Sequence, residues 1–437
     1  MTQPRSTDAS DESRRDFLRS SSAAAASLVA TGLADNRSAH AAGDDVIRVG
    51  LIGCGGRGTK AAAQAVSADP NAKLVAMGDA FPDRLEQSFK SLTTQRKLAG
   101  KIDVPKQRQF VGFDAYRHVT DNVDVVLLTT PPHFRPIHLK YAIDNNRHVF
   151  AEKPIATDAP GVRSVLRTCE EAKRKKLSVV SGLCLRYYDC FRDTVNRIHD
   201  GALGDIHTLQ ASDYRGQIWV KPRQPGWTDM YYQMRNWYYF TWLSGDFNTE
   251  QHVHFLDICA WVMKDQYPVN AVGMGGRAVR NKKEHGNIYD HFSIVYEYAN
   301  GAKLFSNTRQ IRGCWRDMSA YVTGSKGNGH ISENHGKHHM NVDGKKWQYG
   351  GKHNNFYQTE HDELFRSIRD GKPINNGEYM AKSTMMAIMA RMAAYTGQQI
   401  TWDRAMNSKL DLSPPKYDWS ISLPERPVAI PGVTKFV

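Results

Sequence analysis

A glycine-rich turn near the start of the chain has the spacing that dinucleotide cofactors require. Residues 53–58 read Gly-Cys-Gly-Gly-Arg-Gly and follow a short apolar run at 46–52. In a strand, turn and helix of this kind, Gly53 allows the tight turn, Gly55 lets the backbone approach a pyrophosphate, and Gly58 permits close packing of the helix on the strand. The amino terminus of the helix then holds the anion. The sequence therefore predicts a Rossmann-type cofactor site.

Asp79 stands where the second half of such a site needs a carboxylate. It ends an apolar run at 73–78, about 20 residues past the glycine turn, where an acid bonds the ribose hydroxyls. A carboxylate there repels a 2′-phosphate, so NAD is favoured over NADP. Arg84 lies close enough in the sequence to keep NADP as the alternative.

Two further strand ends bring polar side chains to the same place. The apolar run at 123–130 is broken by Pro131-Pro132, which we expect to form a stiff lip beside the cofactor. After a helix at about 136–145, a strand at 147–151 delivers Glu152-Lys153-Pro154 to the same edge of the sheet. The further cofactor-binding residues that we predict are Gly56, Arg57, Thr130, Pro131, Pro132, His138, Glu152 and Lys153.

The part of the chain after about residue 178 has a different pattern. Runs with strand character lie at 206–212, 271–276, 291–298, 302–307 and 319–324. They are joined by glycine turns, which favours antiparallel pairing. We therefore predict an α/β plus α+β protein: a Rossmann NAD-binding domain over residues 43–170, and over residues 171–437 a second α/β domain with an open, mostly antiparallel sheet flanked by helices.

Taken in order, four motifs resemble those of the Gfo/Idh/MocA family, which includes glucose-fructose oxidoreductase and inositol dehydrogenase. They are the turn at 53–58, the lip at 130–132, Glu152-Lys153-Pro154, and the run His254-Phe255-Leu256-Asp257. The resemblance spans most of the chain beyond its first forty residues. It implies that the second domain carries the substrate site and the oligomer contact, that the substrates are sugars or polyols, and that the protein is a homodimer or homotetramer.

The resemblance also implies which residues carry the chemistry. Hydride transfer between a sugar carbinol and nicotinamide needs one group to move the hydroxyl proton and a donor to stabilise the developing alkoxide. His254 aligns with the family's proton-transfer histidine, and Lys153 suits the second role. Glu250 falls on the family's acid four residues earlier, where aspartate is common, and His252 replaces the family's usual glycine. Arg186 matches an arginine early in the family's second domain.

Blander interpretations of the same residues remain open. A histidine on an apolar helical face is usually a core residue, and a lysine before a proline is usually on the surface. Glu250, His252, His254 and Asp257 could also bring metal ligands together, but this spacing is a weak signature and we predict no metal site. We interpret Asp257 as a hydrogen-bonding partner that orients the helix.

An aromatic-rich insertion occupies residues 214–247. Its aromatic and arginine side chains are Arg215, Trp219, Trp227, Tyr231, Tyr232, Arg235, Trp237, Tyr238, Tyr239 and Trp242. Such rings suit the C–H faces of sugars, so a saccharide cleft is one interpretation, and an interface with a neighbouring subunit is the other. The substrate-binding residues that we predict are Arg186, Arg235, Trp237, Tyr238, His252 and Tyr357.

Composition excludes several classes of protein. With 41% hydrophobic and 24% charged residues, the chain is neither disordered nor fibrous. The net charge of +13 would suit a nucleic-acid partner only if the basic residues clustered, and they do not. The six cysteines form no CxxC pair and are expected to be buried thiols. No stretch beyond the leader is long and apolar enough to cross a membrane.

The first 42 residues are predicted to be a twin-arginine signal peptide. Ser13-Arg14-Arg15-Asp16-Phe17-Leu18-Arg19 is followed by a weakly apolar stretch at 20–34 and by a small-residue cleavage pattern at 39–41. We therefore expect a periplasmic or otherwise exported protein. Twin-arginine export moves proteins that are already folded, so a cofactor can travel inside.

Export constrains the reaction, because free NAD is scarce outside the cytoplasm. A tightly held cofactor must be regenerated within each cycle. Dismutation of two sugars would do so. Redox-neutral glycoside cleavage would also do so: transient oxidation at C3 acidifies the C2 proton, the C1 substituent is eliminated, water adds, and NADH returns the hydride. A non-catalytic saccharide-binding protein that retains NAD is a further alternative. An ordinary dehydrogenase that exchanges soluble NAD would require that the leader has been misread.

The sequence assigns no chemistry to the proline-rich tail at 412–437.

Overall fold

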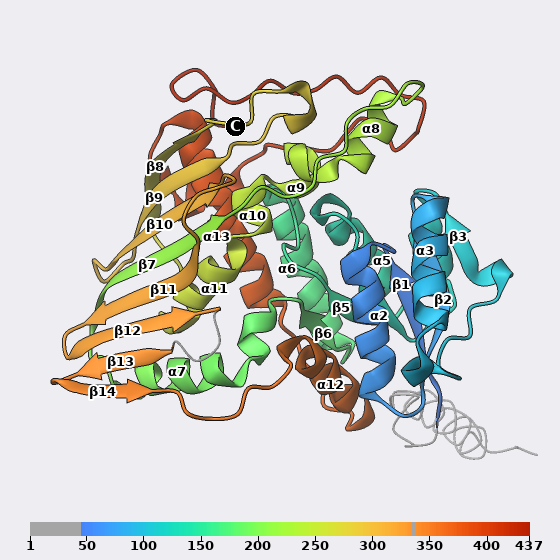
Figure 1. The fold of residues 1–437 in the computed structure, drawn as a ribbon, viewed down its shortest axis with the longest axis horizontal. Helices are drawn as coiled ribbons and strands as arrows, with labels where there is room; N and C mark the ends of the chain where they lie inside the picture. Colours follow the sequence, from blue (N-terminus) through green and yellow to red (C-terminus); the bar gives the residue numbers. More distant parts are fainter. Residues whose placement is uncertain (1–44, 334–337) are drawn as a thin grey trace, which may run out of the picture.

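The chain forms two α/β domains that lie side by side (Figure 1). The computed structural model describes residues 45–333 and 338–437. The predicted leader at 1–42 lies outside the described residues.

The first domain is a doubly wound sheet of six parallel strands in the order β3-β2-β1-β4-β5-β6. The strands are β1 (Ile47–Ile52), β2 (Ala72–Asp79), β3 (Gln109–Val111), β4 (Val125–Leu128), β5 (His148–Ala151) and β6 (Val179–Ser181). The helices are α2 (Gly56–Ala68), α3 (Pro82–Thr93), α4 (Ala115–Asp121), α5 (Arg135–Asp144) and α6 (Ala159–Arg174). The central strands are buried on both faces, which is why they read as unbroken apolar runs.

The boundary of the first domain differs from the prediction. Strand β6 pairs with β5 in parallel, through Val149 with Val179 and Ala151 with Ser181. The sheet thus extends past residue 170, where we had placed its end. A strand of three residues is too short to leave a periodic signal in the sequence.

The second domain is built on a nine-stranded sheet in the order β14-β13-β12-β11-β7-β10-β9-β8-β15. The strands are β7 (Ile206–Arg215), β8 (Asn270–Gly276), β9 (His291–Glu297), β10 (Lys303–Gln310), β11 (Asp317–Gly324), β12 (Gly327–Ser332), β13 (His339–Val342), β14 (Lys345–Gln348) and β15 (Ile400–Thr401). All neighbours are antiparallel except β7 and β10, which run parallel. The prediction of a mostly antiparallel sheet is confirmed.

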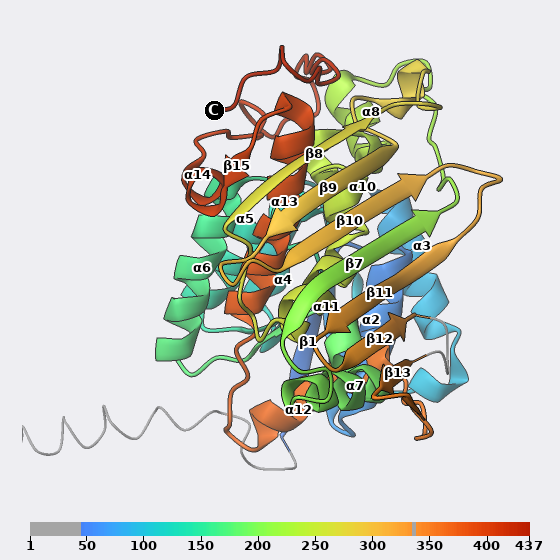
Figure 2. The same ribbon diagram turned by 90° about the vertical axis from the view of Figure 1, so that its left-hand side faces the viewer.

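Helices cover one face of this sheet, and Figure 2 looks onto the other face. The helices of the second domain are α7 (Asp189–His199), α8 (Asp229–Arg235), α9 (Thr241–Ser244), α10 (Phe247–Glu250), α11 (Val253–Val262), α12 (Phe356–Arg369), α13 (Gly377–Thr396) and α14 (Trp402–Asn407). On the face without helices, Met274 is 71% exposed and Phe305 is 41% exposed. The homodimer or homotetramer stays a prediction.

Two helices late in the chain tie the domains together. Helix α13 is buried along most of its length, and its methionines Met380, Met385, Met386, Met389 and Met392 fill the core, as predicted. Helix α12 instead returns to the first domain, where Leu364, Phe365 and Ile368 join the core beneath α2. After α14, the chain runs as an extended tail along the top of the molecule to α8 and back (Figure 1).

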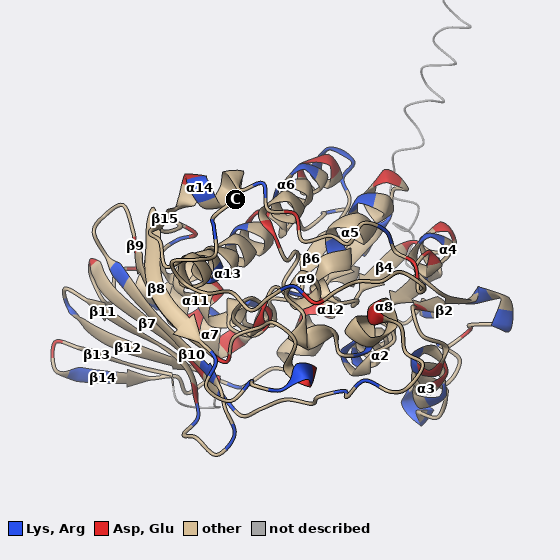
Figure 3. Cartoon of the chain, turned by 90° about the horizontal axis from the view of Figure 1, so that it is seen from above, with Lys and Arg blue, Asp and Glu red and all other residues tan. Residues whose placement is uncertain are grey.

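Charge is spread over both domains. Lysine and arginine alternate with aspartate and glutamate on α3 and α6 (Figure 3). None of the helices among the described residues is long and apolar enough to cross a membrane.

Candidate active site

A cavity of about 570 Å³ lies where the carboxyl ends of β1 to β5 meet the second domain. Because Phe81 and Phe113 follow β2 and β3, whereas Lys153 follows β5, the cavity runs along the edge of the first sheet. The predicted site residues that line it are Gly53, Gly55, Gly56, Arg57, Gly58, Asp79, Thr130, Pro131, His138, Glu152, Lys153, Arg235, Trp237, Glu250, His254 and Tyr357.

The glycine turn is shaped to receive an anion. Gly53 has a φ of +96°, and a Cβ there would lie 2.6 Å from the Thr130 nitrogen. A Cβ on Gly58 would lie 2.0 Å from the Gly53 oxygen, so helix and strand approach too closely for any side chain. At Gly55 and Gly56, in contrast, a Cβ would meet nothing within 4 Å. The open space lies at the amino terminus of α2, where a pyrophosphate fits.

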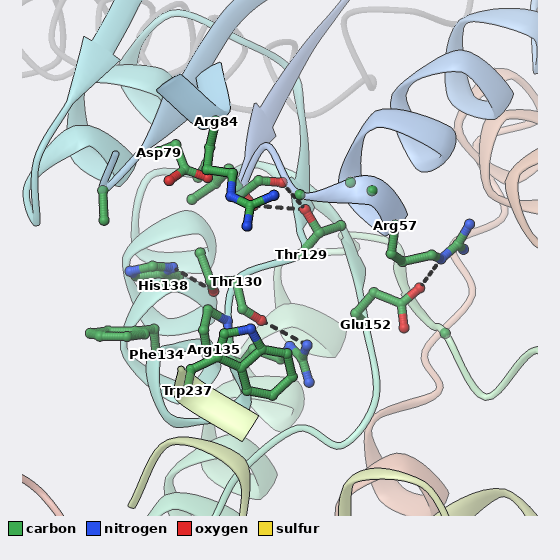
Figure 4. A pocket seen from close by; sticks show the side chains of 18 of the residues that line it. Arg57, Asp79, Arg84, Thr129, Thr130, Phe134, Arg135, His138, Glu152 and Trp237 are labelled. Carbon is green, nitrogen blue, oxygen red and sulfur yellow. Dashed lines mark hydrogen bonds and ion pairs between the residues drawn. The ribbon is translucent and has the colours of Figure 1, made fainter. Parts of the chain in front are cut away.

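Asp79 ends β2 at the cavity wall, as predicted, and its carboxylate already has backbone partners. Oδ2 accepts a hydrogen bond from the Cys54 amide at 2.6 Å, and Oδ1 accepts one from the Phe81 amide at 2.9 Å. Each carboxylate oxygen has a second lone pair, so Asp79 retains acceptors for ribose hydroxyls. Arg84 also lines the cavity beside it (Figure 4). These residues fit the adenosine half of NAD.

The lip after β4 is fixed by an arginine that the sequence did not single out. Arg135 donates to the Thr130 carbonyl at 2.7 Å and to the Pro154 carbonyl, so it joins the lip to the Glu152-Lys153-Pro154 loop. Burial lowers the pKa of Arg135 to about 10. His138 stacks on Tyr116 with ring centroids 4.2 Å apart, and burial lowers its pKa to about 3, so it lines the cavity as a neutral ring.

Arg57 links the glycine turn to two buried carboxylates. It donates to Glu152 and to Glu360 of α12, and its guanidinium lies 4.8 Å from the centre of the Tyr357 ring. Burial opposes the charge of Glu152, but Arg57, Lys153 and Arg135 outweigh it and lower the pKa of Glu152. Figure 4 shows Arg57 turned toward Glu152.

Lys153, Glu250 and His254 meet at the end of the cavity below β5. The Lys153 Nζ donates to the Glu250 carbonyl at 2.6 Å and to its Oε1 at 3.2 Å. His254 is the second residue of α11, and its Nδ1 is buried without a hydrogen-bond partner. Burial, followed by the charges of Lys153 and Arg215, holds the pKa of His254 well below its ordinary value. The structure therefore assembles a cation, a carboxylate and a neutral imidazole.

His252 lies beneath this group and does not line the cavity. It is fully buried, and its Nε2 shares a hydrogen bond of 2.8 Å with Ser306. Burial lowers its pKa to about 3. Its Nδ1 lies 4.0 Å from Asp213, which pairs with Arg215. The structure does not bring His252 to a position for substrate contact, but it does place it under Arg215.

Three other predicted residues also lie away from the cavity. Arg186 makes two hydrogen bonds of 2.9 Å to Asp257, pairs with Asp265, and lies 3.9 Å from the Tyr379 ring centre. Tyr238 is 1% exposed and accepts a hydrogen bond from Gln310. Pro131 lines the cavity, whereas Pro132 is buried and does not. We therefore correct the predicted substrate contacts of Arg186 and Tyr238, because packing and buried partners occupy both side chains.

Several cavity-lining residues were not among the predicted site residues. They are Phe81, Phe113, Phe134, Arg135, Arg215, Trp219, Gln251 and Glu333. Arg215 and Trp219 carried a usable signal, because both belong to the arginine and aromatic residues of the predicted insertion at 214–247. Glu333 lies 3.6 Å from Arg215, and only the pairing of β11 with β7 and β12 brings the two together. In the described part of the chain, no group of three His, Cys, Asp or Glu could hold a metal ion.

Parts of the chain are similar to proteins of known name. The chain is similar over 282 residues to inositol 2-dehydrogenase of Rhizobium meliloti, with 26% identity covering 64% of this chain and 74% of that protein. It is 27% identical over 173 residues to a glycosyl hydrolase family 109 protein of Bacteroides fragilis, covering 38% of this chain and only 34% of that one.

Solved structures agree in fold. The aldose-aldose oxidoreductase of Caulobacter crescentus, solved with glycerol, superposes with a TM-score of 0.64 at 17% identity, covering 82% of this chain and all of that one. A levoglucosan dehydrogenase in complex with NADH and levoglucosan gives 0.65 at 15% identity, covering 82% of this chain and 99% of that one.

Two sequence models of one family match consecutive parts of the chain. Residues 47–181 match the oxidoreductase family with an NAD-binding Rossmann fold, and residues 191–329 match the GFO/IDH/MocA C-terminal domain. Together they span more than half of the 437 residues. The glycine turn, Asp79 and the open space at the start of α2 fit the cofactor that this family binds. The chain therefore belongs to the GFO/IDH/MocA family of oxidoreductases and has that family's NAD-binding domain.

Proposed function

We propose that this protein is an exported, NAD(H)-dependent oxidoreductase acting on a carbinol of a sugar or polyol, with a tightly bound cofactor that is recycled within each catalytic cycle. The observation that carries the proposal is the meeting of Lys153, Glu250 and His254 at one end of the cavity whose other parts fit NAD. Inositol 2-dehydrogenase and levoglucosan dehydrogenase, to which the chain is similar, support a sugar or polyol substrate.

The three residues divide the work on the substrate hydroxyl. NAD, when bound, takes up or returns the hydride. His254 is neutral because burial depresses its pKa, so it can accept the hydroxyl proton as a general base. The Lys153 ammonium has three N–H groups; two point to Glu250, and the third is left to stabilise the developing alkoxide. Glu250 thus fixes the direction of that donor.

The charges of the cavity suit a neutral substrate. Its cationic side chains are Arg57, Arg84, Arg135, Lys153, Arg215 and Arg235, and its acidic ones are Asp79, Glu152, Glu250 and Glu333. Two of these cations are neutralised by acids outside the lining, Arg235 by Asp83 and Arg215 by Asp213, so the cavity with its partners carries no surplus of charge. Arg215, the last residue of β7, also pairs with Glu333. A sugar or polyol without a carboxylate therefore fits best.

Export rests on the sequence of the leader, and tight retention of the cofactor follows from export. The twin-arginine pattern at 13–19 directs folded proteins across the membrane, and an exported enzyme finds little free NAD. Fractionation of cells tests this part: recovery of the protein in the cytoplasm, with the leader still attached, would contradict it.

A second candidate function is redox-neutral glycoside cleavage through a 3-keto intermediate. The similarity to a glycosyl hydrolase family 109 protein favours it, although only about a third of that relative's length is matched. The aromatic rings of Trp219 and Trp237 line the cavity with centroids 6.0 Å apart and supply an apolar wall for a sugar ring.

The first experiment is to purify the protein without added nucleotide and to release any bound NAD(H) by denaturation for mass spectrometry. The native protein is then offered polyols, aldoses and aryl glycosides while the absorbance of reduced nicotinamide is followed. Bound nucleotide that responds to a sugar supports the oxidoreductase. Cleavage of an aryl glycoside with solvent deuterium at C2, and no net change in reduced nicotinamide, selects the second candidate. A protein that neither contains nor binds NAD is a saccharide-binding protein at most.

Variants assign the roles. Lys153→Met and His254→Asn should each lower kcat by about 10²- to 10⁴-fold, since the first removes the donor that stabilises the alkoxide and the second removes the group that accepts the proton. His207→Asn is a matched control, because His207 is exposed on β7 and does not line the cavity. Full activity in His254→Asn would remove the general base from the proposal.

A further inference from the structure

The tail of the chain, to which the sequence assigns no chemistry, packs behind the adenosine end of the cavity. Residues 410–423, here called the strap, lie in the tail that reaches α8 (Figure 1) and pack on the loops after β2 and β3. Trp419 is the central contact. Its ring centroid lies 4.3 Å from that of Phe113 and 5.3 Å from that of Phe81, both of which line the cavity.

The strap also holds α8, which forms the opposite wall of the cavity. Trp419 lies 5.6 Å from Tyr231, and its carbonyl accepts a hydrogen bond from Thr228 at the start of α8. Further along, the Leu423 carbonyl accepts from Gln233 at 2.6 Å and the Leu423 amide donates to Asp229 at 3.0 Å. The strap therefore touches both walls at once.

The end of α8 closes on the first domain through one arginine. Arg235 pairs with Asp83 of α3 at 2.7 and 2.9 Å, and its guanidinium lies 3.8 Å from the centre of the Phe81 ring. Arg235 and Met234 both line the cavity. The ion pair crosses from the second domain to the first at the place where the β2 and β3 loops form the adenosine end.

A fourth contact ties the strap to the lip. The Tyr417 hydroxyl shares a hydrogen bond of 2.8 Å with His133 Nε2, and its ring lies 5.6 Å from that of Phe134, a cavity residue. Burial lowers the pKa of His133 to about 4, so this contact is made by a neutral imidazole at ordinary pH. The strap thus spans the loops after β2, β3 and β4.

We propose that the strap and α8 form a clasp over the adenosine subsite and that release of NAD requires this clasp to open. The adenosine subsite itself is lined by Phe81, Phe113 and Arg235. The inference rests on the proposed function, because only an enzyme that keeps its cofactor needs such a device. For the adenosine half to leave, α8 must separate from α3, which breaks the Arg235–Asp83 pair and withdraws Trp419 from rings on both sides. Trp419 and Tyr417 act as positioning residues, since neither lines the cavity.

The test measures nucleotide release directly. Holoenzyme is mixed with excess labelled NAD, and exchange is followed for the wild type, Trp419→Ala and Phe436→Ala. The control Phe436→Ala removes another aromatic ring of the tail, one that packs on Arg404 away from the cavity. Trp419→Ala should release NAD about tenfold faster or more, a change that corresponds to roughly 1.4 kcal/mol, whereas Phe436→Ala should match the wild type.

Fragments separate a clasp from general loosening of the fold. Because the clasp covers the adenosine end, Trp419→Ala should speed the release of ADP-ribose and leave the release of nicotinamide mononucleotide unchanged. Equal acceleration of both fragments overturns the proposal. If Trp419→Ala does not fold, Tyr417→Phe carries the same comparison, because it removes only the hydroxyl that is bonded to His133 and lies outside the cavity lining.

The remaining outcomes distinguish this inference from the proposed function. A wild type that retains NAD, together with a Trp419→Ala variant that releases it equally slowly, overturns the clasp and leaves the oxidoreductase intact. A wild type that binds NAD but exchanges it within a single turnover overturns both tight retention and the clasp. A wild type that binds no NAD at all refutes the proposed function itself.

Discussion

Glu360 allows a direct test of how the buried charges around the cavity are arranged. Its side chain is fully buried, and it accepts a hydrogen bond from the same Arg57 guanidinium that pairs with Glu152. Burial raises the pKa of Glu360 well above its ordinary value; Arg57 opposes the rise, and Glu152 adds to it. The proton therefore stays on Glu360 at neutral pH, while Glu152 carries the negative charge that Arg57 neutralises.

This protonation has a consequence for stability. Between the pKa of an unfolded glutamate, about 4.3, and the raised pKa of Glu360, the folded chain binds one proton more than the unfolded chain. The free energy of unfolding then falls by about 1.4 kcal/mol for each pH unit as the pH rises. Glu360→Gln keeps the neutral shape and removes that proton. Relative to the wild type, the variant should therefore gain about 1.4 kcal/mol per pH unit between pH 5 and 7.

Urea denaturation of the nucleotide-free protein at pH 5, 6 and 7 measures this difference. Glu363→Gln serves as the control, because Glu363 is on the same helix but is partly exposed and pairs with Arg192. At pH 5 the Glu360→Gln variant should lie within about 1 kcal/mol of the wild type, the net value of one altered hydrogen bond. A difference that stays constant from pH 5 to 7 would refute the reasoning, since it would mean that Glu360 is ionised throughout.

Three further predictions follow from the site. Because burial depresses the pKa of His254, kcat/KM should show no acid limb near pH 6.5 in a profile from pH 5 to 8, and an apparent pKa near 6.5 would contradict the assignment. Arg186→Met should lower the free energy of unfolding by about 3–5 kcal/mol, because Asp257 is left buried without its arginine partner, and it should leave KM unchanged. A raised KM at unchanged stability would instead mean that Arg186 contacts the substrate. Gly55→Ala should leave the melting temperature of the nucleotide-free protein unchanged and weaken NAD binding, whereas Gly58→Ala should lower that temperature, since only its Cβ meets backbone.

The parts of the fold that the sequence predicted are those dictated by neighbours along the chain. The turn at 53–58 requires glycine because Gly53 has a positive φ and Gly58 touches the turn's own backbone, and both constraints arise within six residues. The central Rossmann strands are mostly apolar because both their faces are covered. Asp79 and Lys153 could be placed because the first is the last residue of such a strand and the second lies two residues past the end of one. Strand β6 escaped because its three residues carry no pattern.

The sequence could not predict which distant residues contact each other in the folded protein. Arg186 and Arg135 are both buried arginines, and nothing in their local sequence distinguishes them. Docking of α11 against the short helical turn at 184–187 delivers Asp257 to Arg186, whereas Arg135 lies at the start of α5 and reaches the carbonyls of the lip and of the loop after β5. Arg186 therefore stiffens the second domain, and Arg135 shapes the cavity.

The polar contacts that join the two domains at the site span long separations in the chain. Lys153 and Glu250 are 97 residues apart, Asp83 and Arg235 are 152 apart, and Arg57 and Glu360 are 303 apart. Each joins the Rossmann domain to an element of the second domain. The carboxylate that directs Lys153, the arginine that closes the adenosine end and the acid that holds Arg57 are therefore absent from the first domain alone. The catalytic site therefore forms only when the two domains have docked, whereas the glycine turn and Asp79 of the cofactor site belong to the first domain alone.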